Sequence, residues 1–227
     1  MRQVVHLAVI MDGNRRWAKK EGLPFFMGHR QGGEKIKEVI NWSAERGIKI
    51  LTLYALSIEN LQRPKREVDF LLNLAEKFIE RNTPELKEKG ARVQVLGLRK
   101  GLPPSLVEKI ASIESATREN ERIIVNILFN YSGRVEIVEA VKRIINADFS
   151  PVLVNEAVIE RFLWTNGLPD PDLVIRTSGE MRLSNFLTWQ TAYSEWYFCK
   201  KYWPDFSEKD LDTALEDFDR RQRNFGR

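Results

Sequence analysis

Residues 4–14 read VVHLAVIMDGN, an apolar run that ends at once in an aspartate, a glycine and an asparagine. A continuous apolar run of this length is typical of a strand buried on both faces, and its Asp-Gly-Asn end is typical of a turn. The run is too short, and too soon followed by charges, for a signal peptide or a membrane span. We therefore predict a buried strand over residues 4–11 with polar groups at its carboxyl end.

Strands and helices alternate along the rest of the chain. Apolar patterns predict strands over residues 50–55, 92–98, 123–129 and 173–175, and helices over residues 34–46, 64–79, 104–119, 133–145 and 154–163. Thr83-Pro84 is typical of a cap that starts a separate short turn. Continuous apolar strands between helices indicate a mainly parallel sheet covered by helices on both faces. With no repeat or linker, we predict one α/β domain over residues 1–227.

The composition is that of a globular protein: 43% of the 227 residues are hydrophobic and 30% are charged, which excludes disordered and fibrous classes. Cys199 is the only cysteine, and His6 and His29 are the only histidines. An intramolecular disulfide, a cysteine zinc cluster and a histidine metal site are thereby excluded. We expect a reducing, cytoplasmic setting.

Positive charge is in slight excess, with 36 Lys and Arg against 32 Asp and Glu and a net charge of +4. Such a surplus suits a diphosphate, a nucleic acid or an anionic membrane surface. The basic residues are interleaved with acidic ones, and the arginine cluster in residues 220–227 is short, which argues against nucleic acid. Small phosphorylated ligands are the expected partners, and peripheral membrane contact stays open.

Ligands of open α/β sheets bind beyond the carboxyl ends of the strands, so the residues that follow each predicted strand are the candidates. The first strand is followed by DGNRRW, residues 12–17, and then by GHRQGG, residues 28–33, at a predicted helix start. Glycines and free amides beside cations resemble an anion site, although a plain turn explains the same glycines. After the second strand comes a polar cluster that is either a ligand loop or a helix cap: Ser57, Glu59, Asn60, Arg63 and Glu67.

The sharpest candidate is RTSGEMRLS, residues 176–184. Two arginines and three hydroxyls in so short a segment can surround a phosphate with charge-assisted hydrogen bonds. Two anion sites, with Asp12 and Glu195 as candidate metal carboxylates, predict two phosphorylated substrates brought together with Mg²⁺. The chain has no Walker-type loop and no Gly-x-Gly-x-x-Gly motif, which disfavours nucleoside triphosphates and dinucleotides.

The helix that follows Pro64 is apolar over an unusually broad arc. The arc consists of Val68, Phe70, Leu71, Leu72, Leu74, Ala75, Phe78 and Ile79. Such an arc is typical of a core helix that covers a sheet, and it also suits one wall of an apolar ligand cavity.

Several segments, taken together and in order, resemble the cis-prenyltransferases, the undecaprenyl diphosphate synthase family, over residues 4–226. They are HLAVIMDGNRRWAKKEGLP (6–24), GHRQG (28–32), LTLYALSIEN (51–60), RPKREV (63–68), FNYSGRVEI (129–137), DLVIRTSGEMRLSNFLTWQTAYSEWYF (172–198) and YWPDF (202–206). The resemblance implies a homodimeric α/β fold around an apolar tunnel. It also implies Mg²⁺-dependent condensation of isopentenyl diphosphate with an allylic diphosphate to give a Z-polyprenyl diphosphate.

The resemblance further implies roles for individual residues. Asp12 would bind Mg²⁺ and the allylic diphosphate, and Glu195 would complete the metal site. Asn14 and Ser57 would assist proton removal. The same diphosphate would be held by the block that contains Gly13, Arg15, Arg16 and Trp17, together with His29. Isopentenyl diphosphate would be clamped by Arg176, Arg182 and Ser184, and the loop between the two sites would be shaped by Asn60, Arg63 and Glu67.

Three positions depart from the family pattern. Phe25 stands where members commonly have an arginine that grips the allylic diphosphate, a loss that Arg15 or Arg30 could offset. Leu61 replaces a frequent tryptophan, and Asn224 replaces the arginine of a C-terminal motif that reaches the partner subunit. These departures keep two alternatives open: prenyl transfer to a non-standard acceptor, such as an alcohol or a second allylic diphosphate, and a subunit of a heteromeric enzyme.

Overall fold

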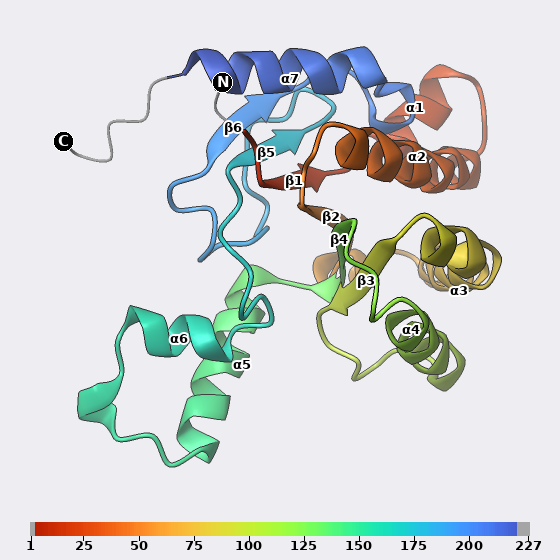
Figure 1. Ribbon diagram of the computed structural model, residues 1–227. Helices are drawn as coiled ribbons and strands as arrows, with labels where there is room; N and C mark the ends of the chain where they lie inside the picture. Colours follow the sequence, from red (N-terminus) through yellow and green to blue (C-terminus); the bar gives the residue numbers. More distant parts are fainter. Residues whose placement is uncertain (1–2, 222–227) are drawn as a thin grey trace.

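A computed structural model describes residues 3–221, and its central element is one sheet of six parallel strands in the order β3-β4-β2-β1-β5-β6 (Figure 1). The strands are β1 His6–Ile10, β2 Ile50–Ser57, β3 Ala91–Leu96, β4 Ile123–Tyr131, β5 Leu173–Arg176 and β6 Glu195–Phe198. β1 lies between β2 and β5. The strands that follow β1 in the chain are therefore added first on one side of it and then on the other. The predicted α/β class with a parallel sheet is confirmed.

The helices form one continuous layer and one separate pair. They are α1 Asn14–Lys20, α2 Phe25–Glu45, α3 Lys65–Glu88, α4 Pro104–Ala116, α5 Gly133–Asn146, α6 Glu156–Phe162 and α7 Glu208–Arg220. Residues of α2, α3, α4 and α7 share one apolar cluster with Leu7 and Val9 of β1, which places these four helices on the same face (Figure 1). Within residues 3–221, none of the helices combines the length and apolar content of a bilayer span.

The opposite face of the sheet is covered mainly by irregular chain rather than by the predicted helices. Ala8 and Ile10 of β1 pack there against Phe186 and Leu187, both fully buried, from the long connection between β5 and β6. The start of α5 is tied to the same connection, because Gly133 N–H donates to Asn185 O at 2.8 Å. Large apolar side chains of a loop thus provide the cover that a helix provides elsewhere.

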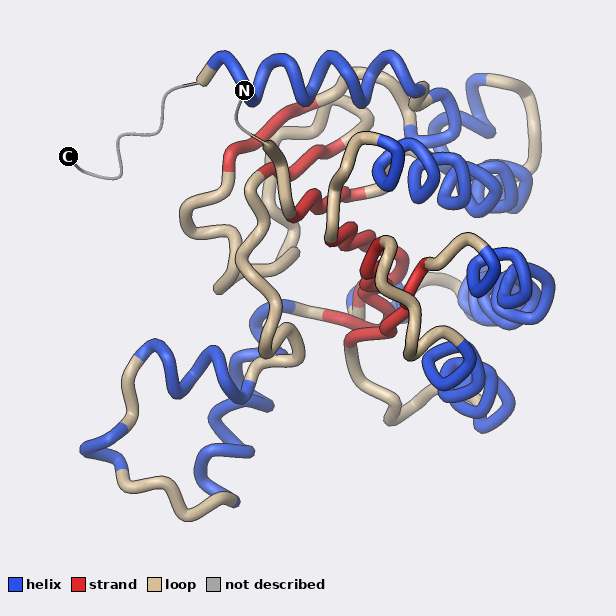
Figure 2. The backbone as a smooth tube through the Cα atoms, viewed as in Figure 1, coloured by secondary structure: helices blue, strands red, loops and turns tan. Residues whose placement is uncertain are grey.

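Helices α5 and α6 pack on each other and project from the sheet, as Figure 2 shows. We call residues 133–162 the α5–α6 arm. Its apolar side chains are unusually exposed: Ile145 is 65% accessible and Val152 is 92% accessible.

Several elements differ from the sequence prediction. The predicted break at Thr83-Pro84 is wrong, because α3 continues to Glu88 and Thr83 Oγ1 donates to Ile79 O at 2.6 Å within the helix. Pro84 is tolerated because Glu80, whose carbonyl loses its usual partner, faces water. Helix α2 begins at Phe25, earlier than predicted. Elements α1, β6 and α7 were not predicted at all.

Candidate active site

The turn after β1 begins the site. Gly13 has φ 105°, a left-handed conformation that favours glycine, and α1 starts at the next residue. A Cβ at Gly13 would lie 2.7 Å from the ring of Tyr202, so the turn has no room for a side chain. Asp12 is thereby held beside the end of β5, where Arg176 pairs in register with Ile10.

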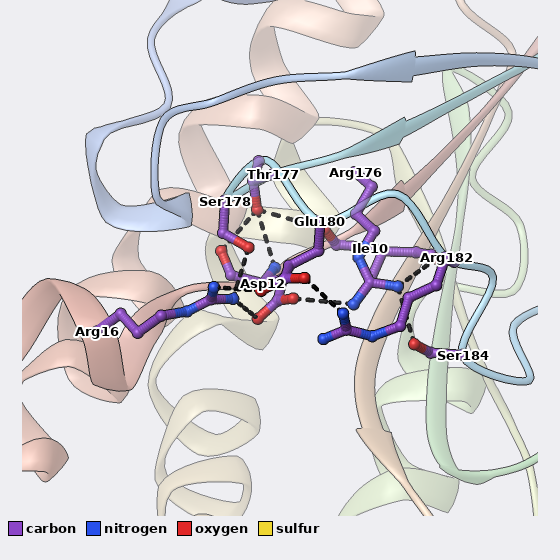
Figure 3. Close-up of polar contacts among 9 residues, drawn as sticks. All are labelled: Ile10, Asp12, Arg16, Arg176, Thr177, Ser178, Glu180, Arg182 and Ser184. Atoms are coloured by element: carbon purple, nitrogen blue, oxygen red, sulfur yellow. Dashed lines mark hydrogen bonds and ion pairs between the residues drawn. The ribbon is translucent and has the colours of Figure 1, made fainter.

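Asp12 bridges two guanidinium groups (Figure 3). Its Oδ2 accepts from Arg176 Nη2 at 2.9 Å, and its Oδ1 accepts from Arg16 Nη2 at 3.0 Å. Thr177 Oγ1 accepts from the Asp12 N–H at 2.8 Å and fixes its backbone. Burial acts to raise the pKa of Asp12, but the bond from Arg176 and the charges of Arg16 and Arg176 outweigh it and lower the pKa. The carboxylate is therefore ionised and preorganised.

The loop after β5 continues this network. Arg16 donates to Ser178 Oγ at 2.7 Å and to Glu180 Oε1 at 2.6 Å, and Arg182 also donates to Glu180 (Figure 3). Arg176 is only 3% exposed and donates to Ser184 Oγ at 2.8 Å. We call this group the Asp12 wall, and it consists of Asp12, Arg16, Arg176, Glu180, Arg182 and Ser184.

The sequence prediction named all members of the Asp12 wall except Glu180. The sequence could have indicated Glu180, because this residue lies inside the segment 176–184 that was predicted to surround a phosphate. The structure shows why it matters: a single carboxylate orients both Arg16 and Arg182. Arg182 is 59% exposed at its side chain, whereas Arg176 is 4% exposed, so one guanidinium is fixed and the other faces solvent.

A second set of charges is grouped around Glu67, and three of its members line the same pocket: Arg15, His29 and Arg63. Glu67 of α3, 5% exposed, accepts from Arg63 at 3.0 Å and lies 3.7 Å from both Arg15 Nη1 and His29 Nε2. Burial, followed by the charge of Arg63, lowers the pKa of His29 to about 4, so the ring is neutral near pH 7. We call Arg15, His29, Arg63 and Glu67 the Glu67 wall.

Ser57 and Asn60 close the pocket at the end of β2. Asn60 N–H donates to Ser57 Oγ at 3.1 Å, and Ser57 N–H donates to Asn60 Oδ1 at 3.2 Å. These reciprocal bonds start the short helical turn Glu59–Gln62. The cluster is thus a cap, as one reading of the sequence had it, and it also lines the pocket.

The glycines of GHRQGG do not form a helix start that cradles an anion. They lie within α2, whose first residue is Phe25, so most of their amides are inside the helix. A Cβ at Gly28 would lie 2.8 Å from the carbonyl carbon of Asn14, and a Cβ at Gly32 would lie 3.0 Å from Asn14 Cγ. Gly28 and Gly32 therefore allow α1 and α2 to approach closely, which corrects the anion-site interpretation of this block.

Two further predicted residues lie away from the pocket. Trp17 Nε1 donates to Asp205 Oδ1 at 2.7 Å, and Trp17 is not among the residues that line the pocket. Glu195 is at the amino end of β6, in register with Leu173 and hence with Leu7. Asp12 follows the carboxyl end of β1, roughly 16 Å away at about 3.3 Å per strand residue. One chain therefore cannot bring Asp12 and Glu195 to the same ion, and Glu195 instead accepts from Arg221 at 2.9 Å.

Asp12 is the candidate metal ligand at the pocket. Residues 3–221 contain no group of three metal-binding side chains. Mg²⁺, however, keeps several waters and commonly binds through one or two carboxylates together with substrate phosphates. The ionised Asp12 at the pocket edge fits that requirement, and the neighbouring guanidiniums fit the phosphates.

The polar pocket opens onto an apolar cavity. The pocket has a volume of about 840 Å³ and the cavity about 150 Å³. Asn14, His29 and Tyr54 line both spaces and mark their junction. The predicted arc of α3 supplies one cavity wall through Leu71, Leu74, Ala75, Phe78 and Ile79. The broad arc is therefore a cavity wall as well as a core helix face.

Phe25 stands at the polar pocket beside His29. Its ring makes edge contacts with Phe26 at 5.9 Å, His29 at 6.4 Å and Phe70 at 6.2 Å between centroids. An aromatic cluster thus occupies this side of the pocket. Arg15 lines the pocket near it, whereas exposed Arg30 does not.

Comparisons with known proteins agree with this geometry. Residues 10–226 match a family model described as putative undecaprenyl diphosphate synthase. An isoprenyl transferase of Thermotoga maritima is 47% identical, covering 100% of this chain and 98% of the relative, and one of Streptococcus mutans is 45% identical, covering 97% and 92%.

Two solved structures are also similar. The lavandulyl diphosphate synthase of Lavandula x intermedia, in complex with dimethylallyl diphosphate, has a TM-score of 0.95 and 37% identity, with 99% of each chain covered. A probable undecaprenyl diphosphate synthase of Campylobacter jejuni has a TM-score of 0.85 and 31% identity, with 100% of each chain covered. The chain belongs to the undecaprenyl diphosphate synthase family and is a prenyltransferase enzyme.

Proposed function

We propose that this enzyme condenses isopentenyl diphosphate with an allylic prenyl diphosphate, with Mg²⁺, to form a Z-polyprenyl diphosphate. One observation supports this above all: a pocket walled by guanidinium groups opens directly onto an apolar cavity. The first space suits two diphosphates, and the second suits a hydrocarbon chain. A prenyl diphosphate combines a strongly anionic head with a wholly apolar tail, which matches the two spaces.

The proposed reaction forms one carbon–carbon bond. The terminal methylene carbon of isopentenyl diphosphate bonds to C1 of the allylic substrate, the C1–O bond of that substrate breaks, and inorganic diphosphate leaves. A proton leaves C2 of the isopentenyl unit as its new double bond forms. Asn14 and Ser57, at the pocket edge, assist that removal, and the released diphosphate can carry the proton away.

Charge develops on both sides of the breaking C1–O bond. The leaving diphosphate becomes more anionic, so fixed cations stabilise the transition state more than the ground state. We assign Gly13, Arg15, Arg16 and His29 to the allylic diphosphate, and Arg176, Arg182 and Ser184 to isopentenyl diphosphate. Mg²⁺, held by Asp12 and substrate phosphates, would neutralise charge on the leaving group when bound. The apolar lining excludes water from the allylic cation.

Product analysis tests the proposal. The purified chain is incubated with Mg²⁺, isopentenyl diphosphate and allylic primers of several lengths, and the products are measured by mass spectrometry. We expect a ladder of added five-carbon units that requires both Mg²⁺ and isopentenyl diphosphate. Full consumption of primer without such units would contradict chain elongation.

A second candidate activity is prenyl transfer to a second allylic diphosphate or an alcohol. Phe25 favours it, because an aromatic ring stands where a diphosphate-gripping arginine is expected. The similar lavandulyl diphosphate synthase is in complex with dimethylallyl diphosphate, an allylic diphosphate, which supports the same idea. Incubation with dimethylallyl diphosphate, alone and with added prenyl alcohols, tests it: a ten-carbon diphosphate or a prenyl ether would establish this activity, and unchanged substrate in both incubations would exclude it.

We propose that the enzyme is a cytoplasmic homodimer with peripheral membrane contact during product release. The exposed apolar side chains of Ile145, Val152 and Leu153 on the α5–α6 arm support a self-association surface, since contact with a second chain would remove them from water. The departure at Asn224, which keeps a heteromer open, lies outside the described residues. Light scattering measures the oligomeric state: a homodimer has twice the 26.5 kDa chain mass. Ile145→Lys should shift the measured mass toward that of the monomer.

A further inference from the structure

Asn14 occupies an unusual place between two helices. It is the first residue of α1, and its side chain points against α2 at the junction of the pocket and the cavity. Its Oδ1 is buried and has no hydrogen-bond partner within residues 3–221. A buried acceptor without a partner is unfavourable, so the packing around Asn14 must hold its carboxamide in this orientation.

Gly32 is the residue that leaves room for this side chain. A Cβ at Gly32 would lie 3.0 Å from Asn14 Cγ and closer still to Oδ1. The clash involves the end of a side chain, which can rotate away. An added methyl would therefore displace the carboxamide while leaving the backbone of α1 in place.

Gly28, one turn earlier on α2, differs in kind. A Cβ there would lie 2.8 Å from the carbonyl carbon of Asn14, which is backbone and cannot rotate away. Gly28 therefore sets the distance between α1 and α2, whereas Gly32 sets the direction of one side chain. Gly33, the next residue, would place a Cβ with nothing within 4 Å.

We propose that Gly32 is a positioning residue: it holds the Asn14 carboxamide at the junction of the two spaces, where the proton is removed. This inference rests on the proposed function for the role of Asn14, but the placement of the side chain is independent of it. A misplacement of about 1 Å at a reacting group can reduce the rate by about a hundredfold. A single methyl at Gly32 should consequently act through Asn14.

A double-mutant cycle tests the proposal with the full chain. Gly32→Ala should lower kcat by roughly 10- to 100-fold, while the KM for each diphosphate changes by less than about threefold. In an Asn14→Ala background, the same Gly32→Ala change should alter kcat by less than about twofold, because the side chain it displaces is absent. Single-turnover measurements keep the slow background variants quantifiable.

Gly33→Ala is the matched control, since it adds the same methyl to the next residue of the same helix. Gly33 borders the apolar cavity, so Gly33→Ala can change kcat on its own. The control is therefore a comparison of two backgrounds: Gly33→Ala should change kcat by the same factor in the chain with Asn14 and in Asn14→Ala. Gly32 also lies near Trp203, whose Cδ1 would be 2.9 Å from an added Cβ. An equal loss from Gly32→Ala in both backgrounds would assign the effect to Trp203 packing and overturn the proposal.

A measurement without turnover separates this proposal from the proposed function. The side-chain amide signal of Asn14 is identified in a ¹⁵N spectrum by its loss in Asn14→Ala. Gly32→Ala should shift that signal, and Gly33→Ala should leave it in place. An unshifted signal in folded Gly32→Ala would overturn the positioning role even if the enzyme is active. A shifted signal in a chain that makes no prenyl product would sustain the positioning and reject the proposed chemistry instead.

Discussion

The Asp12 wall and the Glu67 wall face the same pocket but are built differently. In the Asp12 wall, Arg176 is almost fully buried, and the bonds of Asp12 to its guanidiniums are 2.9 and 3.0 Å long. In the Glu67 wall, two of the three contacts to the carboxylate are 3.7 Å long, and the Arg15 side chain is 58% exposed. One wall is preorganised before any ligand binds. In the other, the long contact to Glu67 leaves the exposed Arg15 free to turn toward a diphosphate.

The strongest way to break this comparison is to remove the central charge of the rigid wall. Asp12→Asn keeps the shape of the side chain but removes the negative charge that offsets the charges of Arg16 and Arg176. It also removes the proposed Mg²⁺ ligand. We expect kcat/KM to fall by about 10²- to 10³-fold or more, as for loss of a preorganised electrostatic group. Steady-state kinetics measure the loss. Glu208→Gln, which removes a 50% exposed partner of Arg46, is the charge-matched control and should leave kcat/KM unchanged.

Acid should lower the free energy of unfolding through His29, a member of the Glu67 wall. The unfolded chain protonates this ring below about pH 6.5, whereas burial and Arg63 keep the folded ring neutral until about pH 4. The unfolded state therefore binds more protons between these values, and the free energy of unfolding falls as the pH is lowered through this window. The loss is up to about 3 kcal/mol at 1.36 kcal/mol per pKa unit.

Urea unfolding of wild type and His29→Gln at pH 7.5, 6 and 4.5 measures that contribution. His6, whose pKa burial also lowers to about 4, is present in both proteins and cancels in the difference. Asp12 acts only below its ordinary pKa of 3.8, outside the window. Parallel pH profiles for the two proteins would show that His29 does not carry the effect.

Removing the central charge of the second wall should have a smaller effect than in the first. Glu67→Gln keeps the hydrogen bonds to Arg63 in part and frees Arg15, which is largely solvated already. We expect a loss of about 1 kcal/mol in the free energy of unfolding and at most about a tenfold change in kcat/KM. A loss as large as that of Asp12→Asn would mean that the two walls are equally rigid.

The smallest expected change comes from adding a cation. Phe25→Arg places a guanidinium beside His29 at the edge of the pocket and should lower the KM for the allylic substrate about fivefold, near 1 kcal/mol for one charge-assisted bond made partly in water. Phe25→Leu, which removes the ring without adding charge, is the control. An equal KM for both variants would show that the ring, and not the missing charge, sets substrate affinity.

The sequence predicted the rigid wall better than its surroundings. Asp12 and Arg176 lie at the ends of apolar strands, and strand ends of a parallel sheet meet at one edge, so their meeting was predictable. Glu195 was misplaced because the four-residue β6 is half-buried and not strongly apolar. Without that strand, nothing in the sequence tells which end of the sheet Glu195 occupies.

The glycines show a second limit of sequence reasoning. Gly28 and Gly32 look like a phosphate loop because glycine permits either a turn or a close approach, and the sequence does not separate the two. The distinction required the position of Asn14 on α1. That helix was not predicted, because its start, Asp12-Gly13-Asn14, is typical of a plain turn. Contacts between neighbouring helices are tertiary, so local patterns do not report them.

The cavity under α3 has a further consequence for how far a product can grow. At about 150 Å³ it resembles an engineered cavity that just admits benzene, a six-carbon ring, whereas every isoprene unit brings five carbons. Under the proposed function, a product longer than the first units needs more space than the cavity has. Side chains of α3 such as Leu74 and Phe78 must then move to make room for it. Each unit gains up to about 4 kcal/mol of burial at about 0.8 kcal/mol per methylene. Under the proposed function, product length would then depend on how far the side chains that line this cavity can move.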